Sequence, residues 1–195
     1  MIIGITGTPG TGKTSACKAS GLEYVDLNSV IAEKGFYTGV DPQRECLIAD
    51  LDGIREYMSH KEEKVLVIES HLSHLLKPAV AIVLRANPSV LAERLTQKGF
   101  PPRKIQENME AETLDIILAE AVELCDTVYE IDTSGKSVNE VAALVREIID
   151  GESETEAKEE SDIRTERKIA LREKYKPGTV DWTSFIEQIC LNYTK

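Results

Sequence analysis

The sequence predicts an α/β fold in which a five-stranded parallel sheet is covered by helices on both faces. Short apolar runs alternate with stretches of helical periodicity, which is typical of parallel strands joined by crossover helices. These runs lie near residues 2–6, 23–26, 65–68, 79–84 and 127–131. The first run leads directly into a glycine-rich segment, and open sheets of this kind bind ligands at the carboxyl ends of their strands. The sequence thus predicts both the sheet and the edge where a ligand binds.

The glycine-rich segment, residues 7–14, reads GTPGTGKT and matches GxxxxGK[ST] at every fixed position. Gly10 and Gly12 let the backbone approach closely, so that its N–H groups meet phosphate oxygens at the start of the next helix. Lys13 is expected to reach the β- and γ-phosphates, and Thr14 to place its hydroxyl on Mg²⁺. This segment therefore predicts a P-loop that binds a nucleoside triphosphate.

The next segment, residues 26–49, is polar and punctuated by glycine, and we interpret it as an arm that receives an acceptor nucleotide. Ser29 and Arg44 are its candidate substrate-binding residues. From Cys46 to Met58, apolar residues recur at three- and four-residue spacing, which predicts a helix.

An acid and two histidines follow the apolar run 65–68. An acid at the tip of a strand beside a phosphate-binding loop holds Mg²⁺ or directs a nucleophile. We therefore predict that Glu69 serves the metal and that His71 lines the same cleft. The alternatives are that Glu69 is a surface acid and that His71 and His74 are capping or packing residues.

Asn87 and the proline after it start a helix that should run to about residue 99, with the asparagine as its cap. Against an acidic background, the surrounding basic residues are Arg85, Arg94, Lys98, Arg103 and Lys104. A phosphoryl group in transfer carries spread negative charge, which nearby cations stabilise. We predict that residues 97–107 form a flap that closes over the triphosphate and excludes water. In this hypothesis Arg94 is catalytic, Lys98 binds the nucleotide and Arg103 binds the acceptor; a solvated basic turn is the alternative.

The loop 132–136 follows the fifth apolar run, and its Lys136 is placed to border a base, unless this loop is a plain turn. A capping box at Ser137 then opens the last helix of a domain that spans residues 1–150. The remainder, 151–195, begins with an acidic stretch that reads as a linker or a solvated helix surface. Its lone tryptophan, Trp182, marks a short amphipathic segment that we expect to pack on the core rather than on a partner.

Composition and charge argue against several classes of protein. The chain of 195 residues carries a net charge of −11, which argues against unassisted binding to nucleic acid. It has no apolar run of membrane-spanning length and no secretory signal, so we expect a cytoplasmic protein without membrane contact. The four cysteines lack CxxC pairing and three fall in apolar helical patterns, which predicts buried, reduced thiols rather than disulfides or a zinc site.

Five segments taken in order resemble the adenylate kinase isoenzyme 6 family, and more narrowly its archaeal-type adenylate kinases. They read GTPGTGKT, IESHLSH, VLRANPSVLAERL, QKGFPPRKIQEN and KYKPGTVDW. The resemblance implies a P-loop NTPase of the nucleoside monophosphate kinase type, which binds ATP and Mg²⁺ and transfers a phosphoryl group to AMP to give two ADP. It also implies a slower ATPase activity used in small-subunit rRNA maturation with a ribosomal protein partner and pre-rRNA contact.

The resemblance also assigns residues. It implies an ATP-binding loop made by Gly10, Gly12, Lys13, Thr14 and Ser15. Glu69 and His71 stand at the family's acid-x-histidine motif, and Lys98 stands at a flap position that is often arginine. Ser29 and Ala32 stand where other members carry an aspartate and an arginine near the acceptor.

Three functions stay open at the level of sequence. The chain is a nucleoside monophosphate kinase that uses MgATP, a partner-stimulated ATPase switch in ribosome assembly, or a nucleotide-dependent interaction module without catalysis. The intact Lys13 and Glu69 favour the two enzymes over the module.

Overall fold

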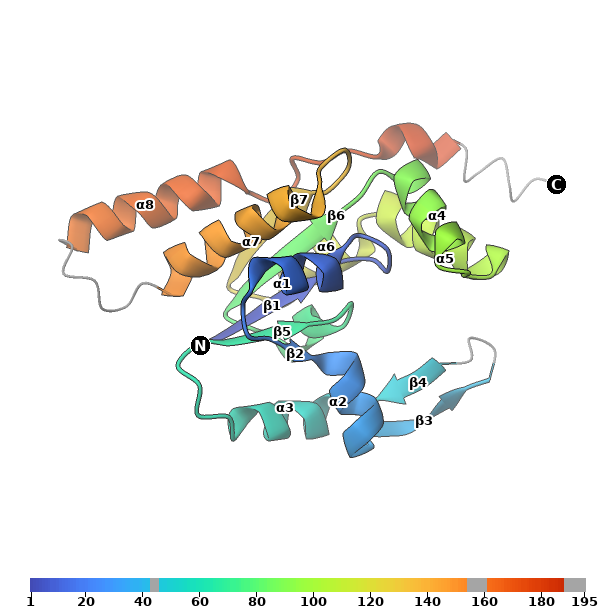
Figure 1. The fold of residues 1–195 in the computed structure, drawn as a ribbon, viewed down its shortest axis with the longest axis horizontal. Coiled ribbons are helices and arrows are strands. Elements are labelled where there is room, and N and C mark those ends of the chain that lie inside the picture. The colour runs from blue at the N-terminus through green and yellow to red at the C-terminus, as the bar shows by residue number, and fades with distance from the viewer. Residues whose placement is uncertain (43–45, 154–160, 188–195) are drawn as a thin grey trace.

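The computed structural model describes residues 1–42, 46–153 and 161–187. Its central sheet consists of β1 (Ile2–Thr6), β2 (Val25–Asp26), β5 (Leu66–Glu69), β6 (Val80–Arg85) and β7 (Thr127–Asp132). These strands lie in the order β2-β5-β1-β6-β7, and every neighbouring pair is parallel (Figure 1). The predicted five-stranded parallel sheet is confirmed.

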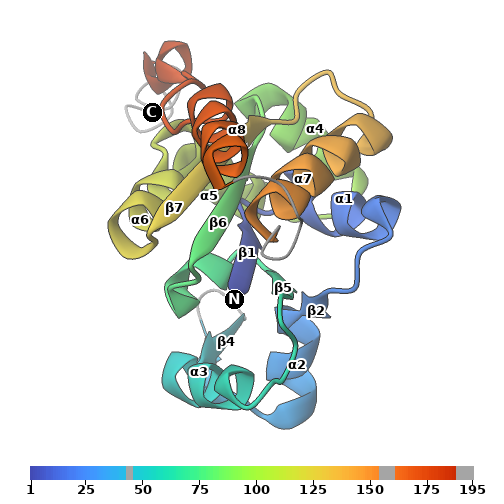
Figure 2. The same ribbon diagram turned by 90° about the vertical axis from the view of Figure 1, so that its left-hand side faces the viewer.

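Helices cover both faces of this sheet, which gives three layers (Figure 2). The helices on or beside the sheet are α1 (Lys13–Ser20), η1 (Ser73–Leu76), α4 (Pro88–Gln97), α5 (Pro102–Thr113), α6 (Ile116–Leu124), α7 (Val138–Ser153) and α8 (Ser161–Lys174). Helices α1 and α7 lie on one face, with α8 packed outside α7, and α6 lies on the other face. None of the described helices is long and apolar enough to span a membrane.

Strand β6 illustrates why the sheet is apolar on both sides. Val80, Ile82 and Leu84 belong to the largest core cluster, on the side of α1 and α7. Ala81 and Val83 point the other way and pack against α6. Because successive side chains in a strand alternate between faces, a strand covered on both sides must be apolar throughout.

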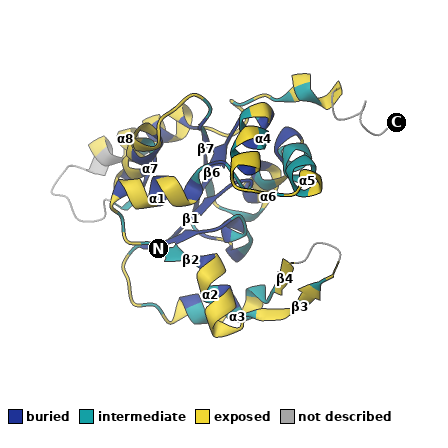
Figure 3. Ribbon diagram, turned by 45° about the vertical axis from the view of Figure 1, so that its right-hand side comes forward, coloured by how far each residue is buried: buried dark blue, intermediate teal, exposed yellow. Residues whose placement is uncertain are grey.

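The arm extends from one edge of the sheet and is largely exposed (Figure 3). It contains α2 (Leu27–Lys34), the antiparallel hairpin β3 (Tyr37–Asp41) and β4 (Cys46–Ala49), and α3 (Leu51–Ser59). The helix predicted from Cys46 to Met58 is thus wrong in its first part. The helix starts only after Asp50, whose side chain accepts a hydrogen bond from the backbone of Gly53 and caps α3.

Cys46 is correspondingly exposed, which corrects the expectation that it is buried in a helix. Cys17 is buried as expected, and Cys125 is half-buried. Most described side chains of the hairpin are exposed, including Val40 at 58% and Ile48 at 50%.

The acidic stretch is partly helical and partly buried. Helix α7 continues to Ser153, and Glu152 is 4% exposed. Its carboxylate accepts a hydrogen bond from Tyr129 and forms ion pairs with Lys168 and Arg172 of α8. The remaining part of the stretch, 154–160, lies outside the described residues. Glu152 therefore belongs to the contact between α7 and α8 rather than to a solvated linker.

The C-terminal segment runs from α8 back across the sheet edge to the short helix η2 (Thr183–Phe185). The backbone N–H groups of Thr179 and Val180 donate to Glu130, and Trp182 is half-buried with its Nε1 3.4 Å from Glu112 Oε1. Trp182 thus contacts the core within the same chain.

Candidate active site

Two positions in the loop after β1 favour glycine, Gly7 because of close approach and positive φ, and Gly12 because of positive φ alone. Gly7 has φ of 134°, and a Cβ there would lie 2.2 Å from the carbonyl oxygen of Leu84. Gly12 has φ of 99° and caps the N-terminus of α1. Both backbones lie in a region that side chains with a Cβ rarely adopt. The glycine pattern therefore corresponds to a tight loop that ends at a helix N-terminus, where anions bind.

Lys13 opens α1 and folds back over this loop. Its side chain is buried, and Nζ donates to the carbonyl oxygens of Gly7 and Thr8 at 2.7 and 3.1 Å. Burial lowers its pKa to about 8, while the carboxylates of Glu69 and Glu112 act in the opposite direction. The loop thus holds a buried cation next to convergent N–H groups.

Thr14 and Glu69 form the oxygen pair that the sequence predicted for a metal. Thr14 Oγ1 donates to Glu69 Oε2 at 3.0 Å. Burial raises the pKa of Glu69, against the effects of Lys13 and of the Thr14 hydrogen bond. Among the described residues there is no cluster of three or more His, Cys, Asp or Glu that could hold a metal. A hydroxyl and a carboxylate fit Mg²⁺, which takes its other ligands from phosphates and water.

Three cavities lie in a row at this edge of the sheet. The loop cavity, about 170 Å³, is lined by Pro9, Gly10, Gly12, Lys13, Thr14, Ser15, Asn28, Glu69, His71, Leu95, Lys98 and Phe100. The β7 cavity, about 410 Å³, is lined by Gly10, Thr11, Gly12, Ser15, Ala16, Arg94, Gln97, Lys98, Thr133, Lys136, Val138 and Val141. The arm cavity, about 450 Å³, is lined by Asn28, Ile31, Cys46, Leu47, Ala49, Leu51, His71, Leu72 and Leu75.

Shared residues connect these cavities. Lys98 and Ser15 line both the loop cavity and the β7 cavity. Asn28 and His71 line both the loop cavity and the arm cavity. The phosphate-binding loop therefore lies between two larger spaces, one on each side.

Asn28 was not identified from the sequence as a site residue. Its Oδ1 accepts from Ser70 Oγ at 3.0 Å, and Ser70 Oγ in turn accepts from the backbone of Leu72. This chain of hydrogen bonds fixes the amide at the junction of two cavities. Its position two residues after the capping Asp26 is the signal that the sequence offered, because a residue in the first helical turn after a strand lies near the end of that strand.

The two histidines have different environments. His71 lines the site, and burial, followed by Lys13 and His74, lowers its pKa to about 4, so the ring is neutral at neutral pH. His74 is 1% exposed and lies between Thr6 Oγ1 and Glu120 Oε2, each 2.9 Å from a ring nitrogen. For His74 the packing alternative is therefore correct.

The predicted cations Arg94, Lys98 and Lys136 do reach the site. Arg94 donates to Thr133 Oγ1 and O, each at 3.1 Å, and to Gly10 O at 3.4 Å, so it lies along the wall of the β7 cavity. Lys98 ends α4 and is exposed between two cavities. Lys136 lines the β7 cavity, and its role beside a base stays a prediction.

Two other predicted residues, Ser29 and Arg103, are not brought to these three cavities, and a third lies outside the described residues. Ser29 donates from Oγ to Asp26 Oδ2 at 3.0 Å and is not among the described cavity-lining residues. Arg103 is exposed and forms a surface ion pair with Glu107 at 3.0 Å. Arg44 lies outside the described residues.

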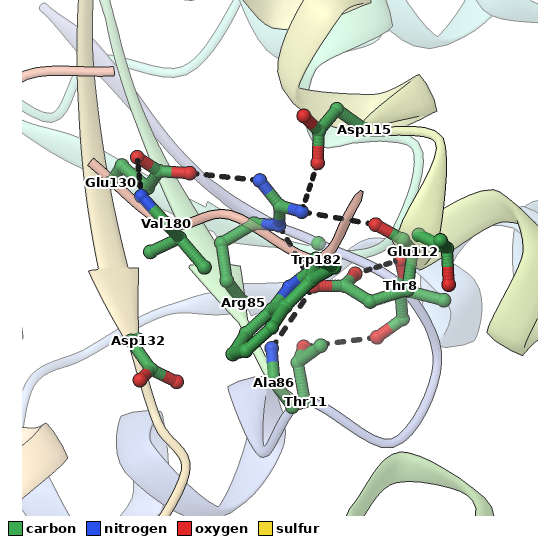
Figure 4. A network of polar contacts seen from close by, with 12 residues as sticks. Thr8, Thr11, Arg85, Ala86, Glu112, Asp115, Glu130, Asp132, Val180 and Trp182 are labelled. Carbon is green, nitrogen blue, oxygen red and sulfur yellow. Dashed lines mark hydrogen bonds and ion pairs between the residues drawn. The ribbon is translucent and has the colours of Figure 1, made fainter. Parts of the chain in front are cut away.

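Arg85, grouped by sequence with the basic residues near the flap, is instead buried in a network of carboxylates (Figure 4). Its Nε and Nη1 donate at 2.8 Å to Glu112 Oε1 and Glu130 Oε1, and Nη2 bonds Asp115. The sequence offered one signal for this role: Arg85 is the last residue of an apolar strand, and a charged side chain that is buried there must be paired. The identity of its partners was not readable from the sequence.

Comparison with known proteins places the chain in a family. Residues 3–115 match the model of an AAA domain. A Methanosarcina barkeri protein named "Putative adenylate kinase" is 41% identical over 194 residues, covering 95% of this chain and 100% of that protein. Among solved structures, thymidylate kinase from Candida albicans has a TM-score of 0.50 at 15% identity, covering 82% of this chain and 95% of that one. Shikimate kinase from Acinetobacter baumannii in complex with shikimate has a TM-score of 0.50 at 17% identity, covering 76% and 92%. At such identities these two structures support the fold alone.

Proposed function

The chain belongs to the AAA-domain family of archaeal proteins that carry the name "Putative adenylate kinase", and on that premise we propose that it is a phosphotransferase. The proposed reaction transfers the γ-phosphoryl group of ATP to AMP and yields two ADP. ATP binds with Mg²⁺ across the β7 cavity and the loop cavity, and AMP binds in the arm cavity.

The observation that supports this function is the row of three cavities. An enzyme that only hydrolyses ATP needs one nucleotide site and a water. Here the loop cavity opens to a second large space on the side away from the β7 cavity, with Asn28 and His71 at the junction. A second substrate in the arm cavity would have its reacting group next to the γ-phosphate position, which is the geometry that phosphoryl transfer requires.

The described residues have distinct roles in this proposal. Lys13 and the backbone of the loop grip the β- and γ-phosphates, and Thr14 and Glu69 hold the metal. Bound Mg²⁺ would neutralise charge on the β- and γ-phosphate oxygens. Lys98 adds a cation at the mouth of the loop cavity, and Arg94 supports the loop through Gly10.

The arm cavity, where the acceptor is proposed to bind, has fewer charged residues in its walls than the loop cavity. No lysine or arginine is among the described residues that line the arm cavity, whose walls are mainly aliphatic. An apolar space suits a base, and the phosphate of the acceptor would lie toward Asn28, His71 and Lys98. The proposed substrate roles of Ser29 and Arg103 gain no support from the three cavities, because neither residue lines any of them, and Arg44 lies outside the described residues.

The decisive experiment measures ADP and phosphate formation from MgATP with and without AMP. We expect ADP formation to depend on AMP, with two ADP formed for each ATP consumed, and to be lost in Lys13→Ala. Phosphate release that is indifferent to AMP would contradict the kinase and indicate an ATPase. Absence of both products in protein that binds ATP would indicate an interaction module.

A pair of variants on the hairpin locates the acceptor. Cys46→Trp should fill the arm cavity and raise the KM for AMP while ATP affinity stays unchanged. Val40→Trp is the matched control, because Val40 lies on the neighbouring strand, is 58% exposed and does not line that cavity among the described residues. Equal KM values for AMP in both variants would place the acceptor elsewhere.

A second candidate, suggested by the resemblance to the isoenzyme 6 family, is a slow ATPase that acts in small-subunit rRNA maturation with a ribosomal protein. The observation that favours it is the contact between Trp182 and Glu112, which connects the C-terminal segment to the phosphate-binding loop. With a net charge of −11, contact with pre-rRNA would be made through a partner. Partner-stimulated phosphate release without AMP is the test of this role.

A further inference from the structure

Glu112 lies in the last turn of α5 and joins the phosphate-binding loop to the end of β6 and to the C-terminal segment. Its side chain is 2% exposed. Oε1 accepts from Arg85 Nε at 2.8 Å, from the backbone of Ala86 at 3.0 Å and from Trp182 Nε1 at 3.4 Å (Figure 4). Oε2 accepts from Thr8 Oγ1 at 2.5 Å. Oε1 of Glu112 is thus fixed by three donors, while Oε2 holds the phosphate-binding loop through Thr8.

Thr8 also contacts Lys13, the residue proposed to bind the phosphates. The carbonyl oxygen of Thr8 accepts from Lys13 Nζ at 3.1 Å and from Thr11 Oγ1 at 2.9 Å. Thr8 is 1% exposed, and neither it nor Glu112 is among the described residues that line the loop cavity. The two residues therefore support the loop from behind and do not face the nucleotide.

Helix α5 also carries the flap. It begins at Pro102, directly after the segment in which Lys98 and Phe100 line the loop cavity, and it packs along α4. A rigid helix moves as a unit. Because α5 is anchored to Thr8 near its C-terminal end, a movement of the flap at its N-terminal end would also move the anchor of the phosphate-binding loop.

We propose that Glu112 is a positioning residue, which holds the phosphate-binding loop in its ATP-binding form through the hydrogen bond from Thr8. The proposal rests on the proposed function in one respect, namely that ATP is the ligand of the loop. Charged hydrogen bonds of this kind are the strong ones, because the acceptor oxygen is ionised and withdrawn from water.

Glu130 provides a matched control within the same network. It is also buried, and it accepts from Arg85 at the same distance of 2.8 Å. Its other oxygen is bonded by Thr179 and Val180 of the C-terminal segment instead of by the loop. Glu130→Gln therefore disturbs the ion network as Glu112→Gln does, without altering the contact to Thr8.

The experiment measures MgATP affinity by calorimetry and kcat by ADP formation, for wild type and variants that circular dichroism shows to be folded. Thr8→Val removes the hydroxyl at nearly constant shape, and Thr8→Ser keeps it. We expect Thr8→Val and Glu112→Gln each to weaken ATP binding about tenfold, with kcat at saturating ATP changed less than twofold. Thr8→Ser and Glu130→Gln should bind ATP within about twofold of wild type. The double variant Thr8→Val/Glu112→Gln should be no weaker than the weaker single variant, because both remove the same contact.

Two results would overturn the inference alone: ATP binding by Thr8→Val equal to that by Thr8→Ser, or equal losses in Glu112→Gln and Glu130→Gln. If Glu112→Gln does not fold, the Thr8 pair still decides, since neither change touches Arg85. Failure of wild-type protein to bind MgATP would instead overturn the proposed function, and this inference with it.

Discussion

Replacement of Arg85 by methionine should destabilise the protein strongly. Arg85 is 1% exposed, and its guanidinium donates to Asp115 and to two carboxylates that are themselves buried, Glu112 and Glu130. Methionine fills similar space but leaves both carboxylates without their cation. Breaking a buried ion pair by removing one partner costs about 3–5 kcal/mol, a large part of the roughly 5–15 kcal/mol that stabilises a typical domain. In a chain of this size the melting temperature should fall by about 6–20 °C.

Urea unfolding followed by circular dichroism measures this loss directly. Arg103→Met is the matched control, because the Arg103 side chain is 70% exposed and pairs with Glu107 on the surface. An exposed pair contributes less than about 1 kcal/mol, so this variant should unfold nearly as wild type does. Arg85→Lys should fall between the two, since lysine keeps the charge but cannot reach both carboxylates with a planar fork. A loss below about 1 kcal/mol in Arg85→Met would refute the reasoning, because it would mean that the buried carboxylates do not need the guanidinium.

Three further predictions concern other parts of the molecule. AMP should slow the alkylation of Cys46, which lines the arm cavity, and mass spectrometry measures the modified fraction. Cys17 is the internal control and should stay unmodified, because burial raises the pKa of its thiol to about 12. The hydrogen bond from Lys174 lowers the pKa of Glu147 below its ordinary value of 4.5, so this contact stabilises the fold above pH 4.5 and is lost as the pH falls through the lowered pKa. The free energy of unfolding of Glu147→Gln should therefore depend less on pH in that window than that of wild type. Identical plots of this free energy against pH would contradict the assignment. Gly12→Ala should lower the free energy of unfolding by about 1–2 kcal/mol in urea titrations, because φ is 99° while no atom lies within 4 Å of the added Cβ; an unchanged midpoint would contradict it.

The parts of the fold that the sequence predicted are those with a local signal. Strands appear as short apolar runs, and the start of α4 was readable because Asn87 caps it, with its Oδ1 accepting from the backbone of Ser89. The hairpin was missed because the apolar spacing of Cys46 and Leu47 continues into α3, and a two-stranded ribbon of exposed residues has no apolar alternation of its own.

The site was predictable where its residues follow a strand directly. Lys13, Thr14 and Glu69 meet because β1 and β5 are neighbours in a parallel sheet, so the residues after them lie at one edge. Asn28 was missed as a site residue, and Thr133 was included only as part of the loop 132–136, since short polar side chains after a strand are common and carry no motif.

The sequence by itself determined which segments form the strands, the phosphate-binding loop and the acid at the end of β5, because each of these is encoded by a local pattern of residues. Only the tertiary structure decided that Arg85 is a buried anchor rather than a cation of the flap. Its partners lie 27 and 45 positions away along the chain, and the pairing depends on where α5 and β7 pack. The same holds for the order of the three cavities, which arises when helices and loops far apart in sequence enclose one edge of the sheet.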